Sequence, residues 1–516
     1  MRRRALRLVV AAHVAALVFA AATAGARPGG GSSFKGSSSS GRSSSSSSSS
    51  GFSSSISHTP SYSRSPSSSS SDDSGGGSLL FALLLLAVFG GGPALLAIVL
   101  RGVGKRLDWS TGDASSGATE ETVEESPRQS ALRDRLDRMR GRDPDFSVLL
   151  FEDFVYMLYA QAHTLRGRGR TDLLAPWLAP GAQAALATQP GLVEVRGIVI
   201  GAMRWLAVEG TEGDDDAEVT VELETNLGEV DAAGAERTFY RVERWTLARP
   251  ASVRSKPPER MRVVGCPNCG APLDGIVGGT CGYCQAAADA GVFDWQVVDV
   301  ELTASEQRGP MLTSDVAEQG TDLPTVTAPG WEQRWTALAS RDPALDWGAL
   351  SARIGLVFAE MQVAWSTRAW KRARPYVSDN LFQMLAYWID AYTRQKLRNV
   401  TRDAKIERIE VCDVRSDRWY DAITVRVFAS SFDWTESDDG RVVAGNPNRT
   451  RRYTEYWTLM RAAGRGGPAR SDAACPNCGG PVEVTMAGEC AYCRAKVTSG
   501  AFDWVLSRIE QDEAYG

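Results

Sequence analysis

The chain has 516 residues, of which 43% are hydrophobic and 23% are charged; this composition excludes a wholly disordered protein and predicts two or three domains. The formal net charge is −5, but residues 1–106 contain eleven Lys or Arg and only two Asp or Glu, so the rest of the chain is acidic. Nucleic-acid binding depends on a basic surface, and we therefore expect no nucleic-acid partner.

The first residues are typical of an export signal. Arg residues crowd the first seven positions, residues 8–23 form a short apolar run, and Ala24-Gly25-Ala26 supplies the small residues of a cleavage site. We expect a signal peptide over residues 1–26. An uncleaved signal anchor is the alternative, although the apolar run is shorter than the roughly 20 residues that a membrane span needs.

A serine-rich tract and an apolar segment follow. Residues 27–78 are about half serine, so they predict a disordered tract, because so few apolar side chains cannot offset the entropy lost on folding. Residues 79–100 carry no charge and would form about 33 Å of helix, which matches the hydrocarbon thickness of a bilayer. This segment predicts one transmembrane helix.

Positive charge fixes the expected orientation of that helix. Arg101, Lys105 and Arg106 follow it directly, and an excess of Lys and Arg marks the cytoplasmic side of a span. We expect a single-pass protein of the cell inner (cytoplasmic) membrane, with its C-terminal domains in the cytoplasm. Residues 101–142 are interpreted as a juxtamembrane linker, with a short helix over residues 132–139.

The cytoplasmic part repeats four motifs in the same order, which indicates tandem copies of one structural unit. The motifs are Arg-Asp-Pro at 142–144 and 341–343, Trp-Thr-Leu at 245–247 and 457–459, Cys-Pro-Asn-Cys-Gly at 266–270 and 475–479, and Phe-Asp-Trp at 293–295 and 502–504. We assign domain 1 to residues 143–302, a linker to residues 303–340, and domain 2 to residues 341–511.

Each copy shows a helical pattern followed by an alternating one. Apolar residues at helical spacing predict a first helix after the Asp-Pro pair of each copy. In the first copy these residues are Phe146, Leu149, Leu150, Phe154, Met157, Leu158 and Leu165. In the second copy they are Trp347, Leu350, Ile354, Val357, Phe358, Met361 and Trp365. A second helical stretch is predicted over residues 172–187 and 372–397. Alternation then predicts strands over residues 193–208, 218–224 and 239–247, and over 406–414, 422–432 and 453–460. This order indicates an α+β fold with helices on one face of a curved antiparallel sheet.

Eight of the nine cysteines form two sets with the same spacing, two residues within each pair and eleven between the pairs. The sets are Cys266, Cys269, Cys281 and Cys284, and Cys475, Cys478, Cys490 and Cys493. Two cysteines separated by two residues can lie in one tight turn, and two such turns can place four thiolates around one Zn²⁺ ion. We predict two structural zinc sites, because a shell of four thiolates leaves no position for substrate. Disulfides, which a reducing cytoplasm disfavours, and a rubredoxin-like iron site are the alternatives.

The cysteine sets lie between two predicted strands in each copy. Trp-Thr-Leu precedes each set and Phe-Asp-Trp follows it, so we predict that each zinc ribbon, residues 266–284 and 475–493, is an insertion between the last two strands. The ninth cysteine, Cys412, lies in a predicted strand and is interpreted as a small buried residue.

The sequence resembles the Tim-forty-four-like (Tim44-like) family. The resemblance rests on the long helix after Asp-Pro, the second helix after a Pro-containing turn, the strands, the segment at 453–459 (Tyr-Thr-Glu-Tyr-Trp-Thr-Leu) and a closing strand. It covers residues 143–302 and 341–511. It implies two cone-shaped α+β domains of the nuclear-transport-factor-two-like class, each around an apolar pocket, membrane association and docking of other proteins. It implies no catalytic residues. The tandem duplication and the ribbons depart from the mitochondrial member of the family.

These observations favour a membrane-anchored, non-enzymatic binding or scaffold protein, with the membrane and other proteins as its partners. A lipid or small-ligand sensor is the first alternative, with Trp365, Trp370, Trp388 and Trp434 as cavity-lining candidates, although core packing is the simpler interpretation. A pocket-based enzyme is the second alternative.

The enzyme hypothesis depends on a single histidine. The one candidate pair of a catalytic acid and base is His163 with Asp153 or Glu152. The second copy has Ala364 near the position that corresponds to His163. Since the constellation does not repeat, we interpret His163 as structural.

Overall fold

The computed structural model describes residues 129–187, 189–212, 216–261, 295–309 and 320–515, with short pieces at 266, 269, 271, 276–277, 280–286, 312 and 318. The predicted signal peptide (1–26), serine-rich tract (27–78) and transmembrane helix (79–100) lie outside these residues. Within the described part, no helix is long and apolar enough to cross a membrane. All described residues belong to one compact unit of the chain.

We call residues 129–306 the first half and residues 320–515 the second half. The first half contains α4 (Gln129–Asp137), α5 (Val148–Gly167), α6 (Pro180–Ala185), β1 (Leu192–Glu209), β2 (Asp216–Asp231), β3 (Glu236–Pro250), α7 (Pro258–Met261), β4 (Ile276–Val277), β5 (Thr280–Cys281) and β6 (Gln296–Glu306). The second half contains α9 (Trp347–Ser366), α10 (Asp379–Arg394), β7 (Leu397–Ser416), β8 (Tyr420–Ser437), β9 (Val442–Ala462), β10 (Val505–Glu510) and α11 (Asp512–Tyr515), preceded by α8 (Trp331–Arg341). Four short 3₁₀ segments lie at Arg138–Gly141, Thr171–Leu174, Trp370–Tyr376 and Val497–Ser499.

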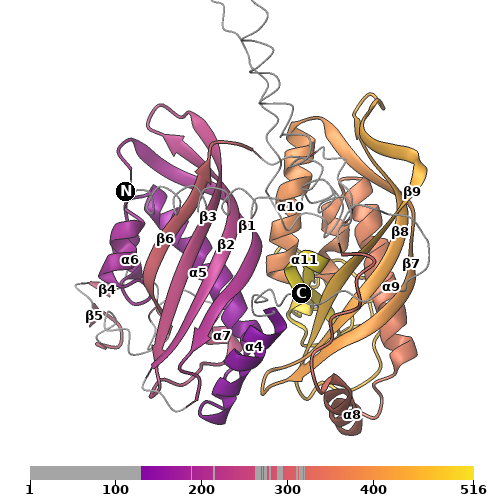
Figure 1. Cartoon of the computed structure of the whole chain (residues 1–516), viewed down its shortest axis with the longest axis horizontal. Helices are drawn as coiled ribbons and strands as arrows, with labels where there is room; N and C mark the ends of the chain where they lie inside the picture. Colours follow the sequence, from indigo (N-terminus) through magenta and orange to yellow (C-terminus); the bar gives the residue numbers. More distant parts are fainter. Residues whose placement is uncertain are drawn as a thin grey trace, which may run out of the picture. The chain divides into compact units, whose positions relative to one another are not determined.

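Each half is built on one antiparallel sheet of four strands. The strand orders are β1-β2-β3-β6 and β10-β9-β8-β7, and every pairing within them is antiparallel. The long helices α5 and α9 pack on the sheets, as Figure 1 shows. The predicted α+β class with antiparallel sheets is therefore confirmed.

The first predicted helix of each half is confirmed, but its start signal is not the Asp-Pro pair. The Ser147 hydroxyl accepts a hydrogen bond from the N–H of Leu150, and the Asp346 carboxylate accepts one from the N–H of Ala349 (2.6 Å). These two side chains cap α5 and α9, because a Ser or Asp at this position satisfies a free N–H of the first turn.

The second predicted helical stretch is wrong in extent. Over residues 172–187 the structure has a 3₁₀ turn and the six-residue α6, because Pro176 and Pro180 interrupt the helical hydrogen bonds. Over residues 372–397 the chain is a 3₁₀ segment containing Pro375, and only then α10, which Ser378 caps. Helix α10 ends at Arg394, and Leu397 already belongs to β7.

The predicted strands are in the right places but too short, β1 excepted. Strand β9 begins at Val442 and not at residue 453, because the segment around Pro447 forms a bulge and does not end the strand. Residues Trp434 and Gly445 are partners, whereas Phe432 already pairs with Thr450. Gly445 has a φ of +75°, which a side chain would strain.

Two segments assigned to linkers contribute to the cores. Leu132, Leu136 and Met139 of the predicted juxtamembrane segment are buried in the hydrophobic core of the first half. Leu338 of α8, within the predicted linker 303–340, is buried in the core of the second half. Short amphipathic helices therefore complete each core from its N-terminal side.

The repeated motifs form the same contact in both halves. Asp143 of the first Arg-Asp-Pro accepts a hydrogen bond from Arg249 of β3 (2.9 Å), and this guanidinium lies 5.2 Å from the Trp295 ring. In the second half Asp342 accepts from Arg461 of β9 (2.8 Å), whose guanidinium lies 4.5 Å from the Trp504 ring.

The role of these motifs is therefore structural. The two aspartates and two arginines are almost fully buried, and a buried charge must be paired to be tolerated. Each contact joins the segment before the long helix to the last two strands of the sheet.

Candidate functional site

The first cysteine set lies between β3 and β6, and the second lies between β9 and β10. The predicted position of these loops, between the last two strands of each sheet, is confirmed. Because those strands still pair with each other, each loop leaves its sheet continuous.

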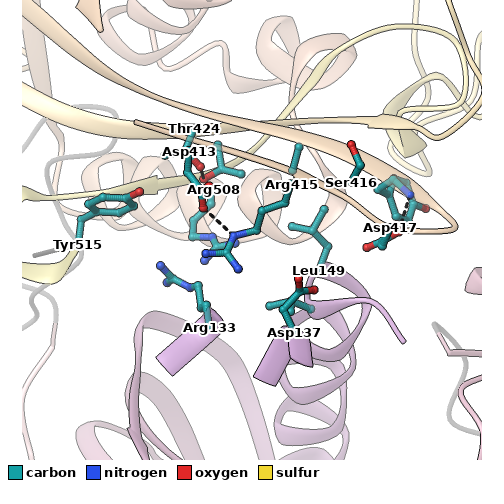
Figure 2. Close-up of a pocket in the computed structure, with 14 residues that line it drawn as sticks. Arg133, Asp137, Leu149, Asp413, Arg415, Ser416, Asp417, Thr424, Arg508 and Tyr515 are labelled. Atoms are coloured by element: carbon teal, nitrogen blue, oxygen red, sulfur yellow. Dashed lines mark hydrogen bonds and ion pairs between the residues drawn. The ribbon is translucent and has the colours of Figure 1, made fainter. Parts of the chain in front are cut away.

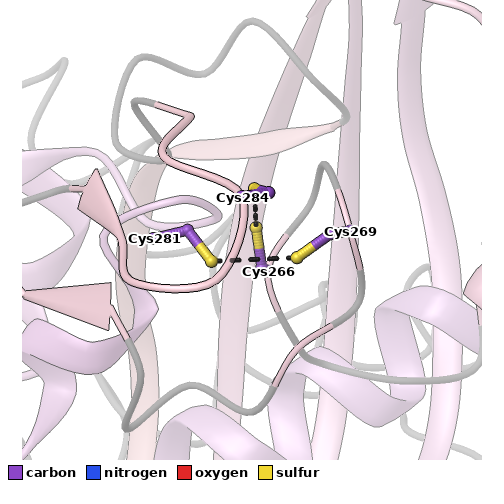
Figure 3. A group of neighbouring side chains, drawn as sticks. All are labelled: Cys266, Cys269, Cys281 and Cys284. Atoms are coloured by element: carbon purple, nitrogen blue, oxygen red, sulfur yellow. Dashed lines mark hydrogen bonds between the residues drawn. The ribbon is translucent and has the colours of Figure 1, made fainter.

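The four sulfur atoms of each set converge on one point. The Sγ atoms of Cys266 and Cys284 are 3.8 Å apart and those of Cys269 and Cys281 are 3.7 Å apart, as Figure 3 shows. In the second set, Cys475 and Cys493 are 3.9 Å apart and Cys478 and Cys490 are 4.0 Å apart.

This geometry fits a metal ion. Four thiolates at about 2.3 Å from a tetrahedral ion lie about 3.8 Å from one another. All four ligand atoms of each set lie within 4.8 Å of one another, so both sets can hold one metal ion. Such a shell is closed, and it can stabilise a fold but not bind a substrate at the metal.

The second loop has few buried apolar residues of its own. Its own hydrophobic cluster contains only Cys475, Val484, Cys490 and Val497 as buried members. The Asn477 amide donates a hydrogen bond to Cys493 Sγ (3.3 Å), and this bond, with the Ala495 N–H and the neighbouring cysteines, lowers the pKa of the Cys493 thiol to about 6. The loop thus favours the thiolate form that a metal ion requires.

The structure does not bring His163 together with Asp153 or Glu152, the candidate constellation of the enzyme alternative, which agrees with the interpretation of His163 as structural. His163 is fully buried on the sheet side of α5, where its Nε2 lies 3.1 Å from a Glu243 carboxylate oxygen and its Nδ1 accepts from Arg166. Because Nδ1 is the acceptor, the ring hydrogen is on Nε2 and donates to Glu243. Asp153 and Glu152 lie on another face of α5 and contact the second half of the chain.

Glu243 shows why His163 is structural. Burial alone would raise the pKa of Glu243, but the hydrogen bonds from His163 and Trp245 and the charge of Arg241 hold this pKa below its usual range. The same bond recurs in the second half, where the Trp457 indole donates to Glu455. In each sheet, a buried glutamate thus accepts a hydrogen bond from a core tryptophan and orients its indole ring.

The tryptophans considered as pocket residues are core residues. Trp365, Trp370 and Trp388 belong to the hydrophobic core of the second half, and Trp434 is 8% exposed with its indole N–H bound to Glu436. The four side chains therefore fill the interior of the second half.

A cavity of about 440 Å³ lies between the two halves. We call it the inter-half cavity; its walls are α5 and residues 198–204 of β1 from the first half, and α10 and residues 507–510 of β10 from the second. Four methionines line it, namely Met157, Met203, Met384 and Met460. Its volume is in the range of small-ligand sites. The sequence did not indicate this cavity, since its walls come from elements that lie far apart in the chain.

A cluster of paired charges lines part of the cavity. Glu152 of α5 accepts from Arg133 (3.2 Å) and from Arg508 of β10 (2.9 Å), and Glu510 accepts from Arg133 (2.7 Å). Figure 2 shows Arg133, Arg415 and Arg508 gathered around an adjoining small cavity of about 40 Å³. This cluster connects the two halves by buried ion pairs.

Comparison with known proteins finds a family model that matches part of the second half. Residues 332–469 match the family model of the Tim44-like domain. The match runs from α8 to a point shortly before the second cysteine loop. It confirms the resemblance to the Tim44-like family for that segment, and it supports a membrane-associated scaffold role in general terms. No curated protein matches the chain.

Proposed function

We propose that the protein is a membrane-anchored, non-enzymatic docking protein that presents two Tim44-like domains to the cytoplasm. The observation that carries the proposal is the Tim44-like match at residues 332–469, on a chain whose sequence predicts one membrane span at residues 79–100. The recurrence of the Asp–Arg–Trp contact and of the strand order in the first half supports a tandem copy of the same domain.

In this proposal each cysteine set holds one structural Zn²⁺ ion. Four converging thiolates and a reducing compartment favour zinc, with iron as the other metal that this donor set accepts. The metal stabilises a loop with few buried apolar residues of its own, and the loop projects from the end of each sheet as part of the docking surface.

Crosslinking in cells tests the docking role. The full chain is crosslinked in intact cells, isolated with its membranes, and its attached peptides are identified by mass spectrometry. The control is an unrelated single-pass protein with the same leader and span. We expect a reproducible set of proteins crosslinked to residues 129–515 and not to the control. Recovery of the same proteins from both chains would contradict the proposal.

A sensor of apolar ligands is the second candidate, favoured by the volume and methionine lining of the inter-half cavity. Native mass spectrometry of the purified chain tests it. A lipid of one fixed mass bound in a ratio of one to one would favour the sensor over the docking protein.

A further inference from the structure

The inter-half cavity runs along the edge of a strand. Residues 198–204 of β1 line it consecutively. Side chains of a strand alternate between its two faces, so a cavity that contacts every residue in turn lies along the edge of the strand. In the sheet order, β1 is an edge strand that pairs only with β2.

The opposite wall contains a second strand edge. Strand β10 is the edge strand of the second sheet, and its residues 507–510 line the cavity consecutively. Ser378 covers the beginning of this edge, because its N–H binds the Leu506 carbonyl (2.9 Å) and its hydroxyl donates to the Ser507 carbonyl (3.3 Å). Two strand edges from different halves therefore face the same space.

Helix α10 packs near β1, but among the described residues the edge of β1 pairs with no strand other than β2. In the part of the chain that the structure describes, no backbone hydrogen bond other than those to β2 reaches residues 198–203. Gly201 and Ala202 are buried and small, and a register irregularity separates Ile200 from Ala202. A small residue in a strand allows another backbone to approach closely.

The dimensions of the cavity favour an extended chain. The wall of α5 runs from Leu149 to Thr164, which is about 22 Å at 1.5 Å per residue. About seven residues of extended polypeptide, at roughly 3.3 Å each, span the same length.

The charges of the lining favour an uncharged occupant. Arg133 and Arg508 are paired with Glu152 and Glu510, and Arg204 is paired with Glu224. Asp153 accepts from the Asn380 amide (2.6 Å). Because the arginines are already paired with glutamates and the Asp153 carboxylate is already hydrogen-bonded, a charged side chain in the cavity would lose more water than these groups could replace.

An acyl chain satisfies only part of this site. It fills the apolar walls, but it displaces water from the β1 edge and offers no donor or acceptor in exchange, which is unfavourable for backbone polar groups. A polypeptide strand pairs with the edge and places alternate side chains among the methionines, whose flexible side chains adapt to different shapes.

We propose that the inter-half cavity binds an extended, uncharged segment of a partner protein, which pairs with the edge of β1 and inserts alternate apolar side chains among Met157, Met203 and Met384. The inference rests on the proposed docking function and names the site and the partner chemistry. Each docked segment joins the two halves, because its backbone lies on β1 and its side chains contact α10.

The experiment uses the full chain in detergent micelles and a fluorescent probe peptide of about seven alternating Val and Thr residues, capped at both ends. Fluorescence anisotropy measures its affinity. Two further peptides carry N-methyl groups on the Val or on the Thr nitrogens. We expect saturable binding of the probe and a loss of about tenfold or more with one of the methylated peptides, because one set of N–H groups pairs with β1.

Matched variants locate the binding. Met203→Asp places a charge on the β1 wall, and Leu323→Asp introduces the same charge at a leucine that is 67% exposed and outside the cavity lining. We expect Met203→Asp to weaken probe binding about tenfold or more and Leu323→Asp to leave it unchanged. Equal metal content of the two variants verifies that both are folded.

Three results would overturn the proposal: no saturable binding of the probe, equal binding of both methylated peptides, or unchanged binding by the Met203→Asp variant. Displacement of the probe by palmitate together with equal binding of the methylated peptides would assign the cavity to an acyl chain. A chain that fails these tests but still crosslinks to partner proteins keeps its docking function and loses only this site.

Discussion

At the scale of single residues, the spacing of the cysteines was sufficient to predict which side chains meet. Both sets converge as expected, since two close pairs on a short loop have few other arrangements. The partner of His163 was not predictable in the same way. Helical spacing indicates which residues share a face of α5, but it does not indicate which strand residue lies across from that face, and Glu243 lies 80 residues further along the chain.

Metal content tests the cysteine sets. We expect two metal ions per purified chain by elemental analysis, and one in the Cys478→Ser variant, because three thiolates hold the ion much less tightly. Cys412→Ser is the matched control, since Cys412 is buried in β7 away from both sets, and this variant keeps both ions. Equal metal content of the two variants would contradict the assignment.

Acid titration tests the Glu243 network. The pKa of Glu243 is lower in the folded than in the unfolded chain, so its ionised form contributes stability above about pH 4.3, and this contribution is lost as the pH falls further. We expect Glu243→Gln to lose less stability than the wild type between about pH 5 and about pH 3 in urea titrations. The exposed Glu194→Gln is the control and follows the wild type. A Glu243→Gln curve parallel to the wild type would be inconsistent with the network.

At the scale of secondary-structure elements, periodicity predicted the type and order of the main helices and strands but not their ends. The strands extend beyond the segments in which apolar and polar residues alternate. A neighbouring strand supplies backbone hydrogen bonds to these extensions, and such bonds do not depend on the side chains. The segment around Pro447 resembled a turn in sequence, yet β8 holds it as a bulge within β9. The repeated motifs identified the two units, and their shared purpose became visible only as the contact between Asp143 and Arg249 and its counterpart.

The bulge of β9 gives a prediction at this scale. A Cβ atom at Gly445 would lie 2.6 Å from the Asp433 carbonyl oxygen, whereas at Gly440, which also has a positive φ, it would meet nothing within 4 Å. Gly440→Ala carries only the backbone strain, so we expect Gly445→Ala to lower the free energy of unfolding by at least about 1 kcal/mol more than Gly440→Ala. Urea denaturation of the two full-length variants measures the difference, and equal values would exclude the close approach.

At the scale of the whole molecule, the arrangement of the two halves was beyond the sequence. The cluster of Glu152, Arg133 and Arg508 joins residues more than 300 positions apart, and charged residues at such positions are normally expected on a solvated surface. The inter-half cavity depends on the same packing and could not be foreseen. The domain assignment, by contrast, followed from the repeat, and the family match at residues 332–469 lies almost wholly within the predicted second domain.

Removal of Glu152 tests the connection between the halves. Glu152→Ala removes one of the two carboxylates that Arg133 and Arg508 share and leaves only Glu510, and breaking a buried ion pair costs up to about 3–5 kcal/mol. Asp145→Ala is the control, because Asp145 also pairs across the halves with Arg418 but in an exposed position, where a pair contributes about 1 kcal/mol or less. We expect urea denaturation to separate the two variants clearly. Equal stabilities would show that the cluster does not hold the halves together.

The central claim is that a single membrane span delivers two Tim44-like domains to the cytoplasm. Its most direct test is the fluorescence of a green fluorescent protein fused after Gly516, recorded in the membrane fraction of bacterial cells, because this reporter matures in the cytoplasm and not after export through the general secretion pathway. The account predicts a fluorescent fusion that remains with the membranes after washing at high pH. A fusion that is dark in the membranes, or fluorescent only in the soluble fraction, would contradict it.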